Sequence, residues 1–467
     1  MTSWLPKSDQ LSRPVYKSLQ NEIIHAIDRG DLQPGARLPT HRDLAYGLNV
    51  SVQTVTRAYE ALRDLGYLSG EVGRGTFVRE RPTETPMPFL PTRESELIDL
   101  SMLKPVITEM HHEVLQNSLQ RLSANLTPNL TQSFRPECAF QKHSMIACRW
   151  LQRRNIPARP AEILFTNGAS PALTAAVMTA VPPGAALCVE EISFHNLKPL
   201  ASYLGIRLCV AEMDEEGLTP DSFEAVCDEH KVRAVMLCPT VANPRSSVMS
   251  VRRRREIIRI AEKHEVYIIE DDVMGATVRN APLTFKALKP DLTFYITSFS
   301  KQIMPGLRVG ILLAPEEMSV AARNRHLVTN WMADALTVEV VCGWLADGTA
   351  DKLVEFQAKA LAKRHKLVRK VLSDIAFYAH DNSTHVWVPL PDGWDEAEFI
   401  SRARSENVAV AGSKPFVMIQ SASGGELAHD NAIRIAVGAG DEDRLKRALT
   451  SLGRLIKSRA EKPLPTF

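Results

Sequence analysis

From about residue 98 onward, short and wholly apolar segments alternate with longer segments that have a helical pattern. Five of the apolar segments are residues 163–165, 186–189, 234–238, 266–269 and 294–296. A strand that is apolar on both faces is buried on both faces, as in a parallel sheet that helices cover on either side. The alternation therefore predicts a large α/β domain with a mostly parallel sheet. Sheets of this kind bind ligands beyond the carboxyl ends of their strands.

The composition limits the classes of protein to which the chain can belong. Its 467 residues exceed one ordinary domain, its apolar content of 45% is normal for globular proteins, and its net charge is only +2. The seven cysteines are scattered, without a Cys-x-x-Cys pair, which predicts reduced thiols and a cytoplasmic location. The first residues lack the apolar core of a signal peptide, and no apolar run reaches membrane-spanning length, so we expect no membrane partner.

Residues 12–80 contain three short helical patterns followed by a hairpin pattern. A first helix is expected over residues 12–31, a second one begins after Thr40, and Ser51 caps a third. This order is typical of a winged helix-turn-helix, in which the third helix enters the major groove of DNA. A small helical cap on an enzyme fits the pattern equally well. The charge of this segment does not distinguish a DNA-binding domain from such a cap, because residues 1–80 hold ten Lys and Arg against nine Asp and Glu.

Four motifs in this segment resemble those of the GntR family of bacterial repressors: LPTHRDLA at 38–45, VSVQTVTRAY at 50–59, LGYL at 65–68 and GRGTFV at 73–78. The resemblance implies binding to an operator in double-stranded DNA. Val52 departs from the family, since many relatives carry arginine there and would gain a phosphate or guanine contact. The residues that the resemblance places toward DNA are Arg42, Ser51, Gln53, Thr54 and Thr56, with Gly73 at the tip of the wing.

A proline-rich segment separates this pattern from the α/β region. Residues 80–94 hold four prolines and show no helical or strand periodicity, which indicates an extended linker. The sequence therefore predicts a DNA-binding domain over residues 12–80, a linker over 81–97, and a second domain over 98–467 that includes a smaller C-terminal α+β subdomain.

Lys301 is the most distinctive residue of the second domain. It lies between the apolar runs 292–296 and 309–313, Ser298 and Ser300 precede it, and Arg308 follows seven residues later. A lysine amine can form a Schiff base with an aldehyde, while hydroxyl groups and a guanidinium can hold a dianionic phosphate. This combination suits pyridoxal phosphate.

Further candidate residues follow other apolar strands. The turn Gly168-Ala169-Ser170 opens a helix, whose free amides can bind phosphate. Asp271 can pair with a protonated pyridine nitrogen, and Asn243 can bond the phenolic oxygen of the cofactor. Taken singly, these residues fit a plain βα turn, a helix cap or surface salt bridge, and an ordinary turn. Their occurrence at four strand ends in one order is much less expected by chance.

The whole pattern resembles the MocR subfamily of GntR regulators, which joins a winged helix-turn-helix to an aspartate-aminotransferase-like domain of fold type I. The resemblance spans nearly the whole chain. It implies a homodimer without a bound metal, in which Arg434 takes the carboxylate of a substrate or effector. It also implies a set of residues that bind pyridoxal phosphate: Lys301 as the Schiff-base lysine, Asp271 on the pyridine, Asn243 on the phenolic oxygen, and a phosphate cup of Gly168, Ala169, Ser170, Ser298, Ser300 and Arg308.

Two positions depart from that family pattern. Phe194 stands where relatives place a tyrosine over the cofactor ring, so it can stack but has no hydroxyl group. Val273 replaces a tyrosine that bonds the phenolic oxygen. Cofactor binding is still expected, whereas efficient transamination is less so. His195 could compensate as a polar neighbour of the cofactor, but a position at the surface is expected for it. His385 is expected in the core.

The resemblance implies a transcriptional regulator that binds DNA and senses a small amino compound through an aldimine at Lys301. Release of the lysine, with engagement of Arg434, would favour another domain arrangement and so alter DNA binding. The alternative is an active aminotransferase with an accessory N-terminal domain, and a regulator without cofactor is a third option. The motifs in residues 35–80 favour the first, and Lys301 and Arg308 argue against the third.

Overall fold

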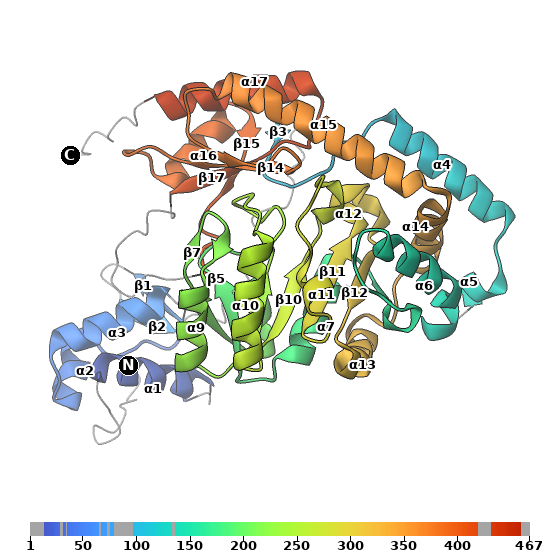
Figure 1. Cartoon of the computed structure of the whole chain (residues 1–467). Helices are drawn as coiled ribbons and strands as arrows, with labels where there is room; N and C mark the ends of the chain where they lie inside the picture. The colour runs from blue at the N-terminus through green and yellow to red at the C-terminus, as the bar shows by residue number, and fades with distance from the viewer. Residues whose placement is uncertain are drawn as a thin grey trace. The chain divides into compact units, whose positions relative to one another are not determined.

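The structure is a computed structural model, shown in Figure 1, which describes residues 14–28, 31–33, 35–64, 67–71, 75–78, 97–132, 136–418 and 431–458. The chain divides into two compact units, Met1–Thr92 and Arg93–Phe467. The segment 79–96, which holds most of the expected linker, lies outside the described residues. Among the described helices, none combines the length and apolar character needed to cross a membrane.

The N-terminal unit has the three helices and the hairpin that the sequence predicts. The helices are α1 (Val15–Asp28), α2 (His41–Leu48) and α3 (Val52–Asp64), and β1 (Leu68–Glu71) pairs antiparallel with β2 (Gly75–Val78). The side chain of Thr40 caps α2 by accepting a hydrogen bond from the amide of Asp43. Apolar side chains of all these elements form one core; they include Leu19, Ile23, Leu44, Val55, Leu62, Leu68 and Val78. The helix-turn-helix fold is thereby confirmed.

A seven-stranded sheet lies at the centre of the described part of the C-terminal unit. β10 pairs in parallel with β9 and β11, β5 pairs in parallel with β6 and β9, and β12 is antiparallel to its neighbours β4 and β11. The mostly parallel sheet predicted from the sequence is therefore confirmed. The strand order is β4 (Leu164–Thr166), β12 (Gly310–Leu313), β11 (Thr293–Ser298), β10 (Tyr267–Asp271), β9 (Val232–Leu237), β5 (Ala186–Glu190) and β6 (Arg207–Ala211).

Helices cover both faces of this sheet. In β5, Leu187 and Val189 pack into one apolar cluster with α7 (Ala169–Ala180), whereas Cys188 packs into another with α9 (Pro220–Glu229) and α10 (Val251–Lys263). Neighbouring residues of a strand point to opposite faces, so a strand covered on both sides must be apolar throughout. This explains the unbroken apolar segments in the sequence.

A four-stranded antiparallel sheet forms the smaller subdomain, in the order β13 (Tyr378–Ala379), β14 (His385–Pro389), β17 (Ala432–Ala436) and β16 (Ala411–Gly412). Figure 1 shows it beside α15 (Thr349–Val371), α16 (Glu396–Ser405) and α17 (Glu442–Lys457), whose apolar side chains share its core. The remaining elements are β3 (Ile98–Asp99), α4 (Glu109–Ala124), α5 (Pro128–Gln132), α6 (Pro136–Gln152), α8 (Leu197–Leu204), β7 (Met213–Asp214), β8 (Gly217–Leu218), α11 (Phe285–Leu288), α12 (Phe299–Gln302), α13 (Ser319–Asn330), α14 (Ala335–Asp347) and β15 (Val408–Ala409).

Candidate functional site

Lys301 lies on the short helix α12, directly after β11. The side chain of Ser298 starts this helix by accepting a hydrogen bond from the amide of Ser300, at 3.3 Å. The Lys301 Nζ atom donates to the carbonyl oxygen of Leu103, at 2.5 Å. Burial, with the positive charges of Arg434 and Arg308, lowers the pKa of Lys301 to about 8, although the carboxylate of Asp271 favours the charged amine. A larger fraction of this amine is therefore neutral near pH 7 than of an ordinary lysine, as a nucleophile requires.

The turn between β4 and α7 contacts Arg308, which precedes β12, the strand that pairs with β4. Arg308 has a left-handed backbone, with φ of 50°, and donates from Nη1 to Ser300 Oγ at 3.3 Å and from Nη2 to the carbonyl oxygen of Asn167 at 3.2 Å. Gly168 has φ of 93°, and a Cβ atom at this position would lie 2.7 Å from Arg308 Nη2. The guanidinium thus occupies space that only glycine leaves open.

Most of the residues predicted for the phosphate cup come together at this turn. Ala169 and Ser170 belong to the first turn of α7, where backbone amides have no partner within the helix. Ser300 contacts Arg308 directly, whereas the Ser298 hydroxyl donates to the carbonyl oxygen of Val309 at 3.2 Å. Ser298 therefore has a structural role in capping, and its predicted contact with phosphate stays a prediction.

Asp271 ends β10, and its neighbour Glu270 anchors the strand. Glu270 is fully buried, accepts the amides of Phe285 and Lys286, and forms an ion pair with Arg254 at 3.2 Å. Burial first, and then the nearby Asp272, raise the pKa of Asp271 to about 7. The buried Oδ1 atom of Asp271 has no hydrogen-bond partner within the described residues. A buried carboxylate oxygen without a partner is costly, and a protonated ring nitrogen would satisfy it.

Arg434 and Asn243, predicted for different parts of the ligand, contact each other. Arg434 projects from β17 and is 3% exposed. Its Nη1 donates to Asn243 Oδ1 and its Nη2 to the carbonyl oxygen of Ser101, each at 2.7 Å, while its guanidinium lies 4.7 Å from the centre of the Phe416 ring. Burial lowers the pKa of Arg434 to about 9. An anionic ligand at this guanidinium would compensate the cost of burying its charge.

Phe194 and His195 lie beside these charged groups. The Phe194 ring is half-buried, and its centre is 4.6 Å from that of His195, which in turn lies 5.5 Å from Phe416. Burial, together with the charges of Arg434 and Lys301, lowers the pKa of His195 to about 4. His195 is half-buried and not fully exposed as expected, because the ring of the distant Phe416 packs against it edge to face. His385 is buried in the core, as expected.

Three contacts of the site escaped the sequence analysis. Two are the backbone carbonyl oxygens of Ser101 and Leu103, which accept from Arg434 and Lys301. Because every residue carries such a carbonyl, no side-chain pattern could have identified them. The third is the ring of Phe416. The residues around Phe416 show no helical or strand periodicity, so the sequence analysis did not place this ring in the site. The site is thus assembled from segments far apart in the chain.

In the N-terminal unit, the predicted DNA-binding residues differ in their surroundings. Arg42, Ser51 and Gln53 are exposed, whereas Thr54 and Thr56 are half-buried. The Ser51 hydroxyl accepts the amide of Thr54 at 3.1 Å and thereby caps α3, and the Thr56 hydroxyl donates to the carbonyl oxygen of Val52 at 3.0 Å. The Ser51 hydroxyl is thus engaged at the start of α3, whereas Arg42 and Gln53 are longer polar side chains that are exposed. Gly73 lies outside the described residues.

Comparisons with known proteins agree with both halves of the fold. The family model of aminotransferase class I and II matches residues 107–452, and the model of gntR family bacterial regulatory proteins matches residues 15–78. An archaeal alanine:glyoxylate aminotransferase has a similar fold, with a TM-score of 0.71 at 22% identity over 77% of this chain and 91% of its own.

Two proteins named as transcriptional regulators are similar to this chain over nearly their full lengths. The uncharacterized HTH-type transcriptional regulator YdeF of Bacillus subtilis is 26% identical over 457 residues, which cover 97% of both chains. The HTH-type pyridoxine biosynthesis transcriptional regulator PdxR of Corynebacterium glutamicum is 25% identical over 460 residues, which cover 93% of this chain and 94% of PdxR. The order of the two domains is therefore shared with proteins named as transcriptional regulators.

Proposed function

The chain belongs to the aminotransferase class I and II family and carries a GntR-type helix-turn-helix, and we propose that it is a pyridoxal phosphate-dependent transcriptional regulator that senses a small amino compound. One observation carries this proposal: a single chain holds both a helix-turn-helix and a half-buried lysine whose pKa is lowered to about 8 by burial and by the charges of Arg434 and Arg308. The names of YdeF and PdxR support the regulatory reading.

The residues of the site fit pyridoxal phosphate. When bound, this cofactor supplies an aldehyde that reacts with amines and a ring that accepts electrons. The partly neutral amine of Lys301 would hold it covalently, and the unpartnered Oδ1 of Asp271 would accept a hydrogen bond from the ring nitrogen. Arg308 and Ser300, together with the N-terminal amides of α7, would hold the phosphate. Asn243 uses its Oδ1 for Arg434, which leaves its amide nitrogen to donate to the phenolic oxygen.

The effector that we propose carries an amine and a carboxylate. Its amine would compete with Lys301 for the aldehyde, and its carboxylate would engage Arg434, whose planar guanidinium favours bidentate binding. Arg434 also donates to Asn243 and to the carbonyl oxygen of Ser101, and these two bonds use two of the five N–H groups of a guanidinium. A bound carboxylate would therefore share the Arg434 side chain with Asn243 and with the 97–104 segment.

We also propose a cytoplasmic homodimer that binds paired half-sites in DNA. The segment 319–336 supports assembly, since four of its large apolar side chains are exposed: Val320 is 68% exposed, Val328 85%, Trp331 54% and Leu336 41%. Exposed apolar groups that gather in one region often mark a protein interface. Closed twofold dimers are the commonest soluble oligomers, and they match the twofold symmetry of palindromic operators.

Reduction with borohydride tests the cofactor assignment. The purified protein with added pyridoxal phosphate should develop a visible absorption band, and borohydride should fix the cofactor on Lys301. Lys286 is an internal control, because burial lowers its pKa to about 8 as well while three carbonyl oxygens hold its amine. Label on Lys286, or a reducible band that persists in Lys301→Ala, would refute the assignment.

An active aminotransferase is the competing proposal, and the retained Lys301, Asp271 and Arg434 favour it. Against it, Phe194 and Val273 lack the hydroxyl groups that the family usually places near the cofactor. Turnover with a panel of amino acids and keto acids decides between the two. Multiple turnovers without any effect of these compounds on DNA binding would favour the enzyme, and altered DNA binding without sustained turnover would favour the regulator.

A further inference from the structure

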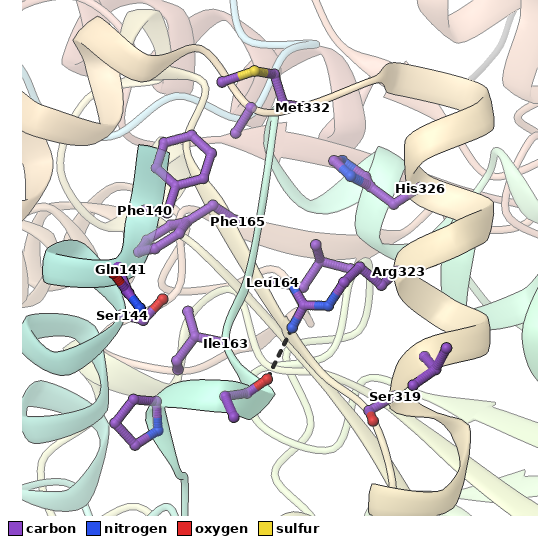
Figure 2. A pocket seen from close by; sticks show the side chains of 14 residues that line it. Phe140, Gln141, Ser144, Ile163, Leu164, Phe165, Ser319, Arg323, His326 and Met332 are labelled. Carbon is purple, nitrogen blue, oxygen red and sulfur yellow. Dashed lines mark hydrogen bonds between the residues drawn. The ribbon is translucent and has the colours of Figure 1, made fainter. Parts of the chain in front are cut away.

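A cavity of about 590 Å³ lies at the edge of the large sheet, beside β4. Figure 2 shows the helix that carries Phe140 on one side of it and the helix that carries Arg323 and His326 on the other. The cavity is of the size that small-molecule sites usually have. Its lining contains neither Lys301 nor any residue predicted for the cofactor; it consists of Phe140, Gln141, Ser144, Pro160, Ala161, Ile163, Leu164, Phe165, Ser319, Val320, Arg323, His326, Met332 and Ala333.

Three polar residues of α13 line this cavity: Ser319, Arg323 and His326. Arg323 and His326 are three residues apart, which places them side by side on a helix. The Arg323 Nη2 atom donates to the carbonyl oxygen of Ala161 at 2.8 Å, the bond drawn in Figure 2. His326 is 2% exposed, and its Nε2 atom has no hydrogen-bond partner within the described residues. Such an atom in a cavity wall indicates a missing partner.

The charges of these side chains select the ligand. Burial, and then the charge of Arg323, lower the pKa of His326 to about 4, so its ring is neutral at physiological pH and can donate one hydrogen bond. Arg323 is a permanent cation with five N–H donors. A neutral donor beside a guanidinium suits a carboxylate and disfavours an amine, because an ammonium group would be repelled by Arg323 and would offer no acceptor to either side chain.

The opposite wall is mainly aromatic and aliphatic, with Gln141 and Ser144 of α6 as its polar members. The rings of Phe140 and Phe165 lie 5.3 Å apart at an angle of 52°, and Figure 2 shows them across the cavity from His326. Ile163, Leu164 and Met332 extend this apolar surface. Flat aromatic groups pack well against such rings and gain both buried area and favourable ring geometry.

We propose that this cavity is a second small-molecule site, which binds an aromatic carboxylate between Arg323 and His326 with its ring against Phe140 and Phe165. The proposal does not depend on the cofactor, but the two sites are linked. Asn167 donates from Nδ2 to the carbonyl oxygen of Met332 in the cavity wall, at 3.3 Å, and its own carbonyl oxygen accepts from Arg308 at 3.2 Å. A ligand that moves Met332 would therefore also act on the turn that holds Arg308.

Titration calorimetry with 2-naphthoate tests the proposal on the full-length protein. The wild-type chain should bind one 2-naphthoate per chain, and 2-naphthylmethylamine should not bind. Arg323→Met should weaken binding by about tenfold to a hundredfold, as expected for the loss of a charge-assisted hydrogen bond. Arg325→Met is the matched control, because Arg325 lies on the same helix but donates to the carbonyl oxygens of Met178 and Ala321. It should bind as the wild type does.

Two further variants separate this cavity from other sites. Val320 lines the cavity at an exposed position, so Val320→Trp should block binding without a change in the core. This variant tests the cavity even if Arg323→Met fails to fold. Arg434→Met should retain binding, since Arg434 belongs to the Lys301 site. The proposal is overturned if 2-naphthoate fails to bind, if Arg325→Met weakens binding as much as Arg323→Met, or if Arg434→Met abolishes it.

Discussion

The pKa of Lys301 is lowered because burial and two positive neighbours outweigh the attraction of one carboxylate. Taking an ammonium group out of water disfavours its charge, and Arg434 and Arg308 add repulsion, so the single attraction to Asp271 does not restore the ordinary pKa. The same arginines are the groups that would hold the anionic parts of cofactor and effector. The charges of Arg434 and Arg308 therefore have two effects: they favour anionic groups of a ligand, and they keep a larger fraction of the Lys301 amine neutral, and hence reactive, at neutral pH.

A pH profile of cofactor attachment tests this coupling. The attachment rate should rise with pH through a midpoint near 8, because the neutral form of Lys301 reacts. Arg434→Met removes a positive charge, which should raise the pKa of Lys301, move the midpoint to higher pH and slow attachment at pH 7 severalfold. The rate is followed by visible absorption after addition of pyridoxal phosphate to the apoprotein.

The exposed Arg252 supplies the control for this profile. It pairs with Glu256 at the surface, so Arg252→Met should leave the midpoint unchanged. An unchanged midpoint in Arg434→Met as well would mean that burial alone lowers the pKa of Lys301.

At the scale of elements, the sequence predicted strands well and their directions poorly. The apolar residues 309–313 correctly indicated a strand, but nothing in their pattern showed that β12 runs antiparallel to β11. That direction follows from the short connection, in which α12 and one turn of 3-10 helix lead straight back. β6 was missed because its residues Arg207 and Leu208 are exposed and half-buried at the sheet edge, so the strand is not uniformly apolar.

The site residues on strand ends were predictable for the same reason that the strands were. Polar residues such as Asp271 stand out directly after an apolar run, and parallel strands bring such positions to one edge. His195 was not predictable, since its burial depends on Phe416, which lies more than 200 residues away in the sequence. Contacts of that range leave no local pattern.

The turn from β4 into α7 should tolerate no side chain. Gly168→Ala would place a methyl group in a region of φ and ψ that only glycine adopts readily and 2.7 Å from Arg308 Nη2. We expect a loss of about 1–3 kcal/mol of stability and weaker cofactor binding, since Arg308 must move. Thermal unfolding and a cofactor titration measure the two effects. Gly306→Ala is the control, because no heavy atom lies within 4 Å of the added Cβ; an equal effect there would refute the argument.

The start of α2 should depend on a single hydroxyl group. The Thr40 side chain accepts the amide of Asp43 at 3.2 Å and donates to its carboxylate at 2.7 Å. Thr40→Ala should destabilise α2 by about 1 kcal/mol, whereas Thr40→Ser should retain the cap. Hydrogen exchange of the α2 amides in the full-length protein should be faster in the first variant alone. Equal exchange in both variants would show that tertiary packing, and not the cap, holds the helix.

The whole molecule joins two units that each have their own core. Apolar side chains of α1, α2, α3 and the hairpin pack together in the N-terminal unit, and the large unit has separate clusters on the two faces of its sheet. Domains with independent cores are able to move relative to one another when their linker permits it. Regulation of the kind proposed here requires such movement, since an effector at Lys301 must change what the DNA-binding domain can reach.

The nearly neutral N-terminal unit makes a prediction about DNA binding. With ten basic against nine acidic residues in positions 1–80, non-specific affinity should be modest, and local contacts should supply most of the specificity. Selection from random duplexes should enrich paired half-sites spaced by about one helical turn or a multiple of it.

Gln53→Ala should cost about 1–3 kcal/mol of binding free energy at one base position and relax specificity there. Arg42→Ala should weaken binding to all sequences if Arg42 contacts phosphate, and should reduce the salt dependence of binding. Arg63→Ala, at an exposed position in the last turn of α3, should leave affinity unchanged. If the selection enriches no motif from the intact protein with cofactor present, the N-terminal unit does not recognise an operator, and the regulator proposal fails even where the Lys301 chemistry holds.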